Sequence, residues 1–141
     1  MPQTGLAQFD TTVQETNQWL QEIMAHFHPD RQIAYHALRG VLHTLRDRLP
    51  VAEVMDFAAQ LPTLVRGIFF EGYNVSNKPI KYSREEFLER VFEELDMAGG
   101  GDPEDATRAV FQVLSDRISE GEVRHVRYAL PQEFNNLWPP D

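Results

Sequence analysis

The chain of 141 residues contains no cysteine, which excludes disulfide bonds, thiolate zinc sites, iron–sulfur clusters and a cysteine nucleophile. Positive charge is also scarce, because 22 acidic side chains outnumber 13 basic ones and give a net charge of −9. Such a field repels phosphate backbones, so we expect no nucleic-acid partner. The lack of cysteine fits a reducing compartment, and we expect the protein to be cytoplasmic.

Long apolar runs are missing as well. No stretch approaches the roughly 20 apolar residues of a membrane-spanning helix, so we expect no membrane association. The first residues have neither the basic nor the apolar segment of a secretory signal, and we expect none. Hydrophobic residues make up 42% and charged residues 25%, as is usual for globular proteins. We expect a single domain over residues 1–141.

Apolar residues recur with the period of a helix along most of the chain, and no useful length alternates with period two. The clearest helix has an apolar stripe made of Ala34, Leu38, Val41, Leu42, Leu45 and Leu49. Capping-box spacings predict helix starts at three pairs: Thr12 with Glu15, Ser83 with Glu86, and Ser119 with Glu122. The predicted fold class is all-α.

Two segments 69 residues apart read almost alike: ALRGVLHTLRDRLPVAEV from Ala37 and ATRAVFQVLSDRISEGEV from Ala106. The matches fall mainly at apolar core positions and helix ends. We predict a compact bundle of two tandem repeats, each of about four helices, two long and two short, packed about a pseudo-twofold axis. The repeats cover residues 9–73 and 83–139, and an irregular connection over 73–82 joins them.

The repeated positions include Glu53 and Glu122, which both fall at the third position of a predicted helix. A carboxylate at this position can accept hydrogen bonds from free N–H groups and meets the positive end of the helix dipole. We therefore interpret both glutamates as helix-capping residues and not as catalytic groups.

Four basic or titratable residues recur at spacings of three and four along the second predicted helix: His36, Arg39, His43 and Arg46. This basic stripe is a possible interaction surface for an anion or an acidic partner, and the alternative is an ordinary solvated face. The acidic segment 84–105 could pair with it, within one chain or across a symmetric dimer.

Four aromatic residues define a possible aromatic seam: Phe69, Phe70, Tyr73 and Trp138. It is either a groove for a partner or apolar ligand, or part of the core between the repeats.

Metal and catalytic signals are weak. Glu22, His26 and His28 offer oxygen and imidazole ligands near a helix end, but their spacing is not that of di-iron bundles. We therefore expect no metal and no other cofactor. The chain contains neither a nucleophile elbow nor a phosphate-binding loop, so it offers no catalytic residues.

Six segments carry a resemblance to a known family: FDTTVQETNQWLQEI at 9–23, AYHALRGVLHTLRDRLPVAEV at 34–54, QLPTLVRGIFFEGY at 60–73, EFLERV at 86–91, DPEDATRAVFQVL at 102–114 and LPQEFNNLWP at 130–139. With them the chain resembles the bacterial domain of unknown function family numbered 2267. The resemblance implies an all-helical, internally duplicated domain with no established activity and no family catalytic residues.

These observations lead to two hypotheses. The first is a non-enzymatic protein-interaction or scaffold module that self-associates, for example as a homodimer, or docks another protein. The alternative is a small-molecule or metal-binding protein, or a weak enzyme, with a site between the repeats near His36, His43 and the aromatic seam.

Overall fold

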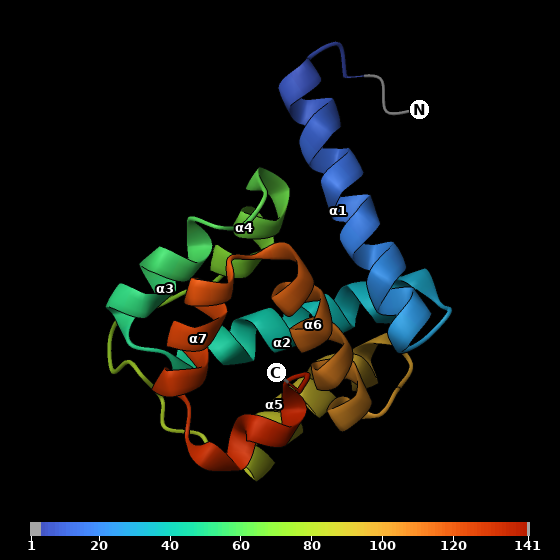
Figure 1. The fold of residues 1–141 in the computed structure, drawn as a ribbon. Coiled ribbons are helices and arrows are strands. Elements are labelled where there is room, and N and C mark those ends of the chain that lie inside the picture. The colour runs from blue at the N-terminus through green and yellow to red at the C-terminus, as the bar shows by residue number, and fades with distance from the viewer. Residues whose placement is uncertain (1–3, 141) are drawn as a thin grey trace.

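The computed structural model describes residues 4–140 and contains only helices there, so the predicted all-α class is confirmed for this part of the chain (Figure 1). In chain order the elements are α1 (Ala7–His26), α2 (Arg31–Arg48), α3 (Val51–Ala58), α4 (Thr63–Phe70), α5 (Arg84–Ala98), α6 (Pro103–Arg117), α7 (Glu120–Ala129) and the 3-10 helix η1 (Gln132–Leu137). Within the described residues, no helix combines the length and the apolar character needed to cross a membrane.

Helix α2 lies at the centre of the bundle and contacts α1, α4, α5 and α6. Its predicted apolar stripe is fully buried, with 0% exposure at Ala34, Leu38, Val41, Leu42, Leu45 and Leu49. Burying a Val or Leu side chain stabilises a fold by about 1.5–3 kcal/mol, so this stripe is a main source of stability. Phe87 of α5 and Phe111 of α6 belong to the same core.

Gly40 allows α5 to approach α2 closely. A Cβ atom at this position would lie 2.8 Å from Cβ of Glu94 on α5, which is nearer than real Cβ contacts allow. Glycine inside a helix is less favourable than alanine by about 1 kcal/mol. The close packing of α2 and α5 therefore depends on a residue that the helix itself disfavours.

Local caps define several helix starts. Ser83 and Glu86 form the predicted capping box of α5: the Ser83 hydroxyl accepts from the Glu86 N–H at 3.1 Å, and Glu86 Oε1 accepts from the Ser83 N–H at 2.9 Å. At α7 the prediction is correct only in part. The Ser119 hydroxyl accepts from the Glu122 N–H at 3.2 Å, but the Ser119 N–H donates to Gln60 Oε1 and not to the Glu122 carboxylate.

The predicted start of α1 is wrong. This helix begins at Ala7, upstream of the proposed Thr12–Glu15 box, and has no side-chain cap. Thr12 lies inside α1, and its hydroxyl accepts from the backbone N–H of Leu64 in the first turn of α4 at 2.8 Å. Because the first N–H groups of a helix lack intrahelical partners, Thr12 caps α4 across the fold instead of capping its own helix.

The elements follow one another in the same order in the two halves. Helices α2 and α6 end at Arg48 and Arg117, and α3 and α7 begin at Val51 and Glu120, each pair 69 residues apart. The halves differ at their ends, where α4 is an α-helix and η1 is a 3-10 helix. Helices α3 and α7 contact each other and lie side by side in Figure 1. The pseudo-twofold relation of the repeats stays a prediction.

Candidate functional site

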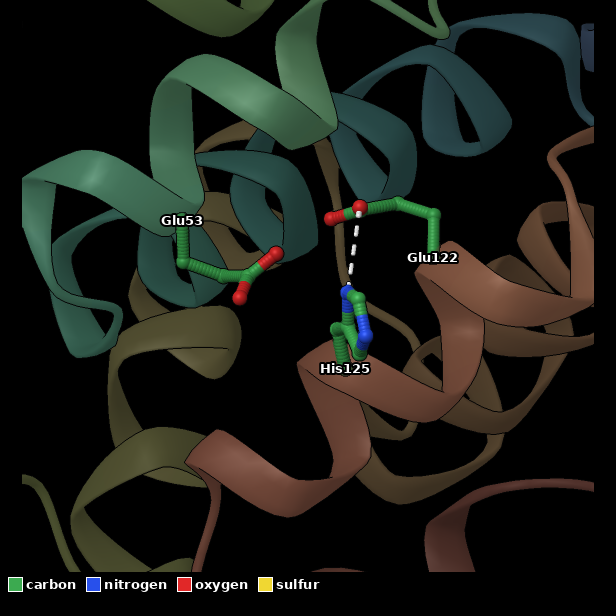
Figure 2. A group of neighbouring side chains, drawn as sticks. All are labelled: Glu53, Glu122 and His125. Atoms are coloured by element: carbon green, nitrogen blue, oxygen red, sulfur yellow. Dashed lines mark ion pairs between the residues drawn. The ribbon is translucent and has the colours of Figure 1, made fainter.

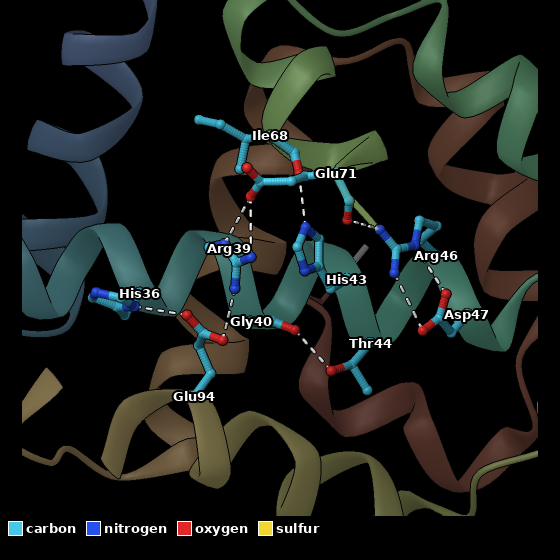
Figure 3. Close-up of polar contacts among 10 residues, drawn as sticks. All are labelled: His36, Arg39, Gly40, His43, Thr44, Arg46, Asp47, Ile68, Glu71 and Glu94. Carbon is cyan, nitrogen blue, oxygen red and sulfur yellow. Dashed lines mark hydrogen bonds and ion pairs between the residues drawn. The ribbon is translucent and has the colours of Figure 1, made fainter. Parts of the chain in front are cut away.

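The basic stripe on α2 contacts other parts of the same chain (Figure 3). His36 Nδ1 lies 2.6 Å from Glu94 Oε2, and Arg39 Nη1 donates to Glu94 Oε1 at 3.0 Å. Arg39 also donates to Glu71 Oε1 from Nε and Nη2, at 3.2 and 3.0 Å. Residues of the stripe are thus paired with the acidic segment within one chain, through Glu94 of α5.

His43 and Arg46 support the C-terminal end of α4. The His43 Nε2–H donates to the carbonyl oxygen of Ile68 at 2.7 Å, and Arg46 Nη1 donates to the carbonyls of Phe69 and Glu71 at 2.8 and 2.9 Å. Arg46 is only 4% exposed. Burial lowers the pKa of His43, despite the opposing effect of its hydrogen bond, so the imidazole is neutral at pH 7. Because the last carbonyls of a helix lack partners, α2 supplies donors where α4 needs them.

The four residues of the aromatic seam lie in two separate groups of rings. The ring centroids of Phe69 and Phe70 are 5.1 Å apart, and those of Phe70 and Tyr73 are 6.0 Å apart. Trp138 stacks on Phe111 of α6 instead, with centroids 3.9 Å apart. Phe69 and Trp138 are buried in the hydrophobic core, so a partner could reach these rings only if the core opened.

The three residues that suggested a metal site do not form one. Glu22 forms an ion pair with Arg117 of α6, and His28 Nδ1 accepts a hydrogen bond from the Asp30 N–H at 3.0 Å. Across residues 4–140, neither these two residues nor His26 belongs to a group of three clustered metal-ligating side chains.

Glu53, Glu122 and His125 form a cluster between α3 and α7 (Figure 2), called the Glu–Glu–His cluster below. One ligating atom of each residue lies within 4.8 Å of the other two, and His125 Nδ1 is 3.9 Å from Glu122 Oε1. Glu53 Oε2 and Glu122 Oε2 are both buried and have no hydrogen-bond partner among residues 4–140. Both glutamates lie in the first turn of their helices as predicted, but among residues 4–140 neither carboxylate accepts a hydrogen bond from a backbone N–H group. Their carboxyl groups face the space between α3 and α7.

Burial strongly affects the protonation of Glu122. Desolvation, reinforced by the contact with the Glu53 carboxyl group and by the charges of Glu53 and Asp56, raises the pKa of Glu122 to about 8. Glu122 is buried and Glu53 is half-buried, so two carboxylates that face each other here would repel, with water only partly available to screen them. The arrangement is chemically suited to hold a positive charge, either a proton shared by the carboxyl groups or a cation.

Two signals in the sequence point to this cluster. The repeated segments align Glu53 with Glu122, and the spacing of Glu122 and His125 places a carboxylate and an imidazole one turn apart on one helix face. Neither signal shows that α3 and α7 face each other, so the sequence alone favours capping roles for Glu53 and Glu122. His125 itself was not identified from the sequence.

A second feature lies near the contact between Thr12 of α1 and the start of α4. Leu6, Phe9 and Leu64 are 51%, 55% and 41% exposed, and we call these three residues the α1–α4 face. The hydrogen bond from the Leu64 N–H to Thr12 holds the start of α4 against α1, one turn from Phe9. The N-terminal half of α1 extends beyond the other helices at this end of the molecule (Figure 1).

The sequence model of a family described as "Uncharacterized conserved protein (DUF2267)" matches residues 16–137 of the chain. A comparison with curated proteins finds no match. The family match spans most of both halves and confirms the resemblance that the six sequence segments indicate.

Proposed function

The chain belongs to the DUF2267 family, whose description names no activity, and we propose that it is a non-enzymatic protein-interaction module. In this proposal its partner is a second copy of the chain, and the contact surface is the α1–α4 face. The observation that carries the proposal is the exposure of Leu6, Phe9 and Leu64 at one end of the molecule.

Exposed apolar side chains favour association because contact removes their surface from water, which contributes about 25 cal/mol per Å². Phe9 lies one helical turn before Thr12, which contacts Leu64, and Leu6 lies one turn before Phe9, so the three form a larger apolar area than isolated residues would. The other exposed large hydrophobic residues among residues 4–140 are distributed over α3, the connection, α5 and α7: Met55, Val75, Phe92, Met97 and Tyr128.

The basic stripe is less suited to be the interface. His36 and Arg39 are paired with Glu94, and Arg46 is buried against the end of α4. A partner that bound these groups would have to replace contacts that hold α4 and α5 on α2. The proposed interface therefore lies on a different part of the molecule from the one that the charge pattern predicted.

The proposal includes a cytoplasmic setting, which the lack of cysteine favours. It includes no nucleic-acid or membrane partner, because a net charge of −9 opposes binding to anionic phosphates.

Sedimentation velocity over a range of protein concentrations tests the proposal. The wild type should show a species of twice the 16.3 kDa chain mass, and the double variant Phe9→Asp/Leu64→Asp should stay monomeric. Both positions lie in the first turn of a helix, where a carboxylate interacts favourably with the dipole, so the variant should fold.

Phe92→Lys is the matched control, because Phe92 is 48% exposed on α5 and the new charge suits that acidic helix. It should dimerise like the wild type. A wild type that is monomeric at every concentration, or a dimer that persists in the double variant, would overturn the proposal. Capture of a different protein by the wild type alone would replace the second copy with that partner.

A further inference from the structure

We propose that Glu53, Glu122 and His125 bind one divalent transition-metal ion of the zinc class between α3 and α7. This site is independent of the α1–α4 face. The three residues form the group of clustered metal-ligating side chains found among residues 4–140. The ion would join two helices whose ligands, Glu53 and Glu122, lie 69 positions apart in the chain.

The spacing of the ligating atoms suits a single small ion after a modest adjustment. Tetrahedral zinc with bonds of about 2.1 Å holds its ligand atoms about 3.4 Å apart. The atoms of the Glu–Glu–His cluster lie within 4.8 Å of one another, so no pair needs to close by more than about 1.4 Å. The side chain of His125 is 66% exposed and can move freely to do so.

The buried oxygens provide the second, independent observation. The Glu122 side chain is only 8% exposed, and its Oε2 atom, like that of Glu53, is buried without a hydrogen-bond partner. Burying a polar oxygen without a partner destabilises a protein, and two facing carboxylates add their repulsion. A cation between them would satisfy both oxygens at once. The cluster is thus more than an accumulation of surface acids, because one oxygen of each glutamate is buried without a partner inside it.

The donor set favours a transition metal over magnesium or calcium. Two carboxylates and one imidazole match the ligands of zinc, whereas magnesium and calcium prefer oxygen atoms alone. Three protein ligands would leave a fourth position for water or a small molecule. Exposure of His125 gives the ion a path from solvent.

Isothermal titration calorimetry with Zn²⁺ tests the site on the tag-free, metal-stripped full chain. The wild type should bind one Zn²⁺ ion per chain, and Glu122→Gln and His125→Ala should each bind it about tenfold or more weakly. Mg²⁺ and Ca²⁺ should bind far more weakly than Zn²⁺. Zn²⁺ should also raise the melting temperature of the wild type and leave that of His125→Ala nearly unchanged.

Two control variants separate this site from surface binding. Glu120→Gln changes an exposed carboxylate on the same helix, and His28→Ala removes a histidine outside the cluster, so both should bind Zn²⁺ like the wild type. Absence of saturable Zn²⁺ binding to the wild type would overturn the proposal and leave a shared proton as the charge between the glutamates. Equal Zn²⁺ binding by the wild type and His125→Ala would also overturn it. His125→Ala should fold even if Glu122→Gln does not, because the side chain that it removes is exposed.

Discussion

Replacing Arg46 by methionine should destabilise the protein by about 3–5 kcal/mol. The Arg46 side chain is 5% exposed, and its Nη1 donates to two backbone carbonyls at the end of α4, those of Phe69 and Glu71. Methionine fills much of the same space but offers no donor, so it leaves both carbonyls without this charged partner.

The magnitude follows from these two hydrogen bonds. A hydrogen bond to a charged group contributes about 1.5–3 kcal/mol, and the apolar contacts of methionine recover part of the loss of two. The ion pair of Arg46 with Asp47 adds little, because the Asp47 carboxylate is 22% exposed and can be hydrated.

Urea unfolding followed by circular dichroism measures the effect, with Arg124→Met as the matched control. Arg124 is 59% exposed and its nearest contact with Glu120 is 3.5 Å, so the control should lose less than about 0.5 kcal/mol. If Arg46→Met lost less than about 1 kcal/mol, its guanidinium would not support α4. Arg46 would then again be a candidate for contact with a partner.

Two further predictions concern packing and protonation. Gly40→Ala should lower the free energy of unfolding by about 1–2 kcal/mol, because the new Cβ would lie 2.8 Å from Cβ of Glu94 and overpacking outweighs the gain in helix propensity. Gly67→Ala is the control, because a Cβ atom at Gly67 would have no described atom within 4 Å, and it should raise the free energy of unfolding by up to about 1 kcal/mol. Equal effects of the two changes on urea unfolding would contradict the close packing of α5 against Gly40. In metal-free protein, the free energy of unfolding should fall as pH rises from about 5 to 8. Glu122 faces Glu53, Asp56 and His125, and its pKa in the folded chain is raised to about 8. The folded chain therefore holds a proton that the unfolded chain releases near pH 4.3. Melting temperatures across this range should vary less for Glu122→Gln, and an equally steep fall in that variant would assign the dependence to other groups.

Features that depend on neighbouring residues were predictable from the sequence. The stripe from Ala34 to Leu49 is buried as its periodicity predicts, and Ser83 with Glu86 forms the predicted capping box. Periodicity determines which face of a helix is apolar, and a cap involves residues three positions apart, so both are encoded locally. The all-α class and the order of the helices follow from such local signals.

Features that depend on which helices meet were decided by the tertiary structure alone. Thr12 has the spacing of a cap for α1 but accepts a hydrogen bond from α4, and Glu122 has the spacing of a cap for α7 but faces Glu53 of α3. The sequence placed Arg46 on a charged stripe, but its hydrogen bonds to the end of α4 arise only where α2 and α4 pack. Side-chain chemistry and local spacing are written in the sequence, whereas the partner of each polar group is chosen by packing between segments far apart in the chain.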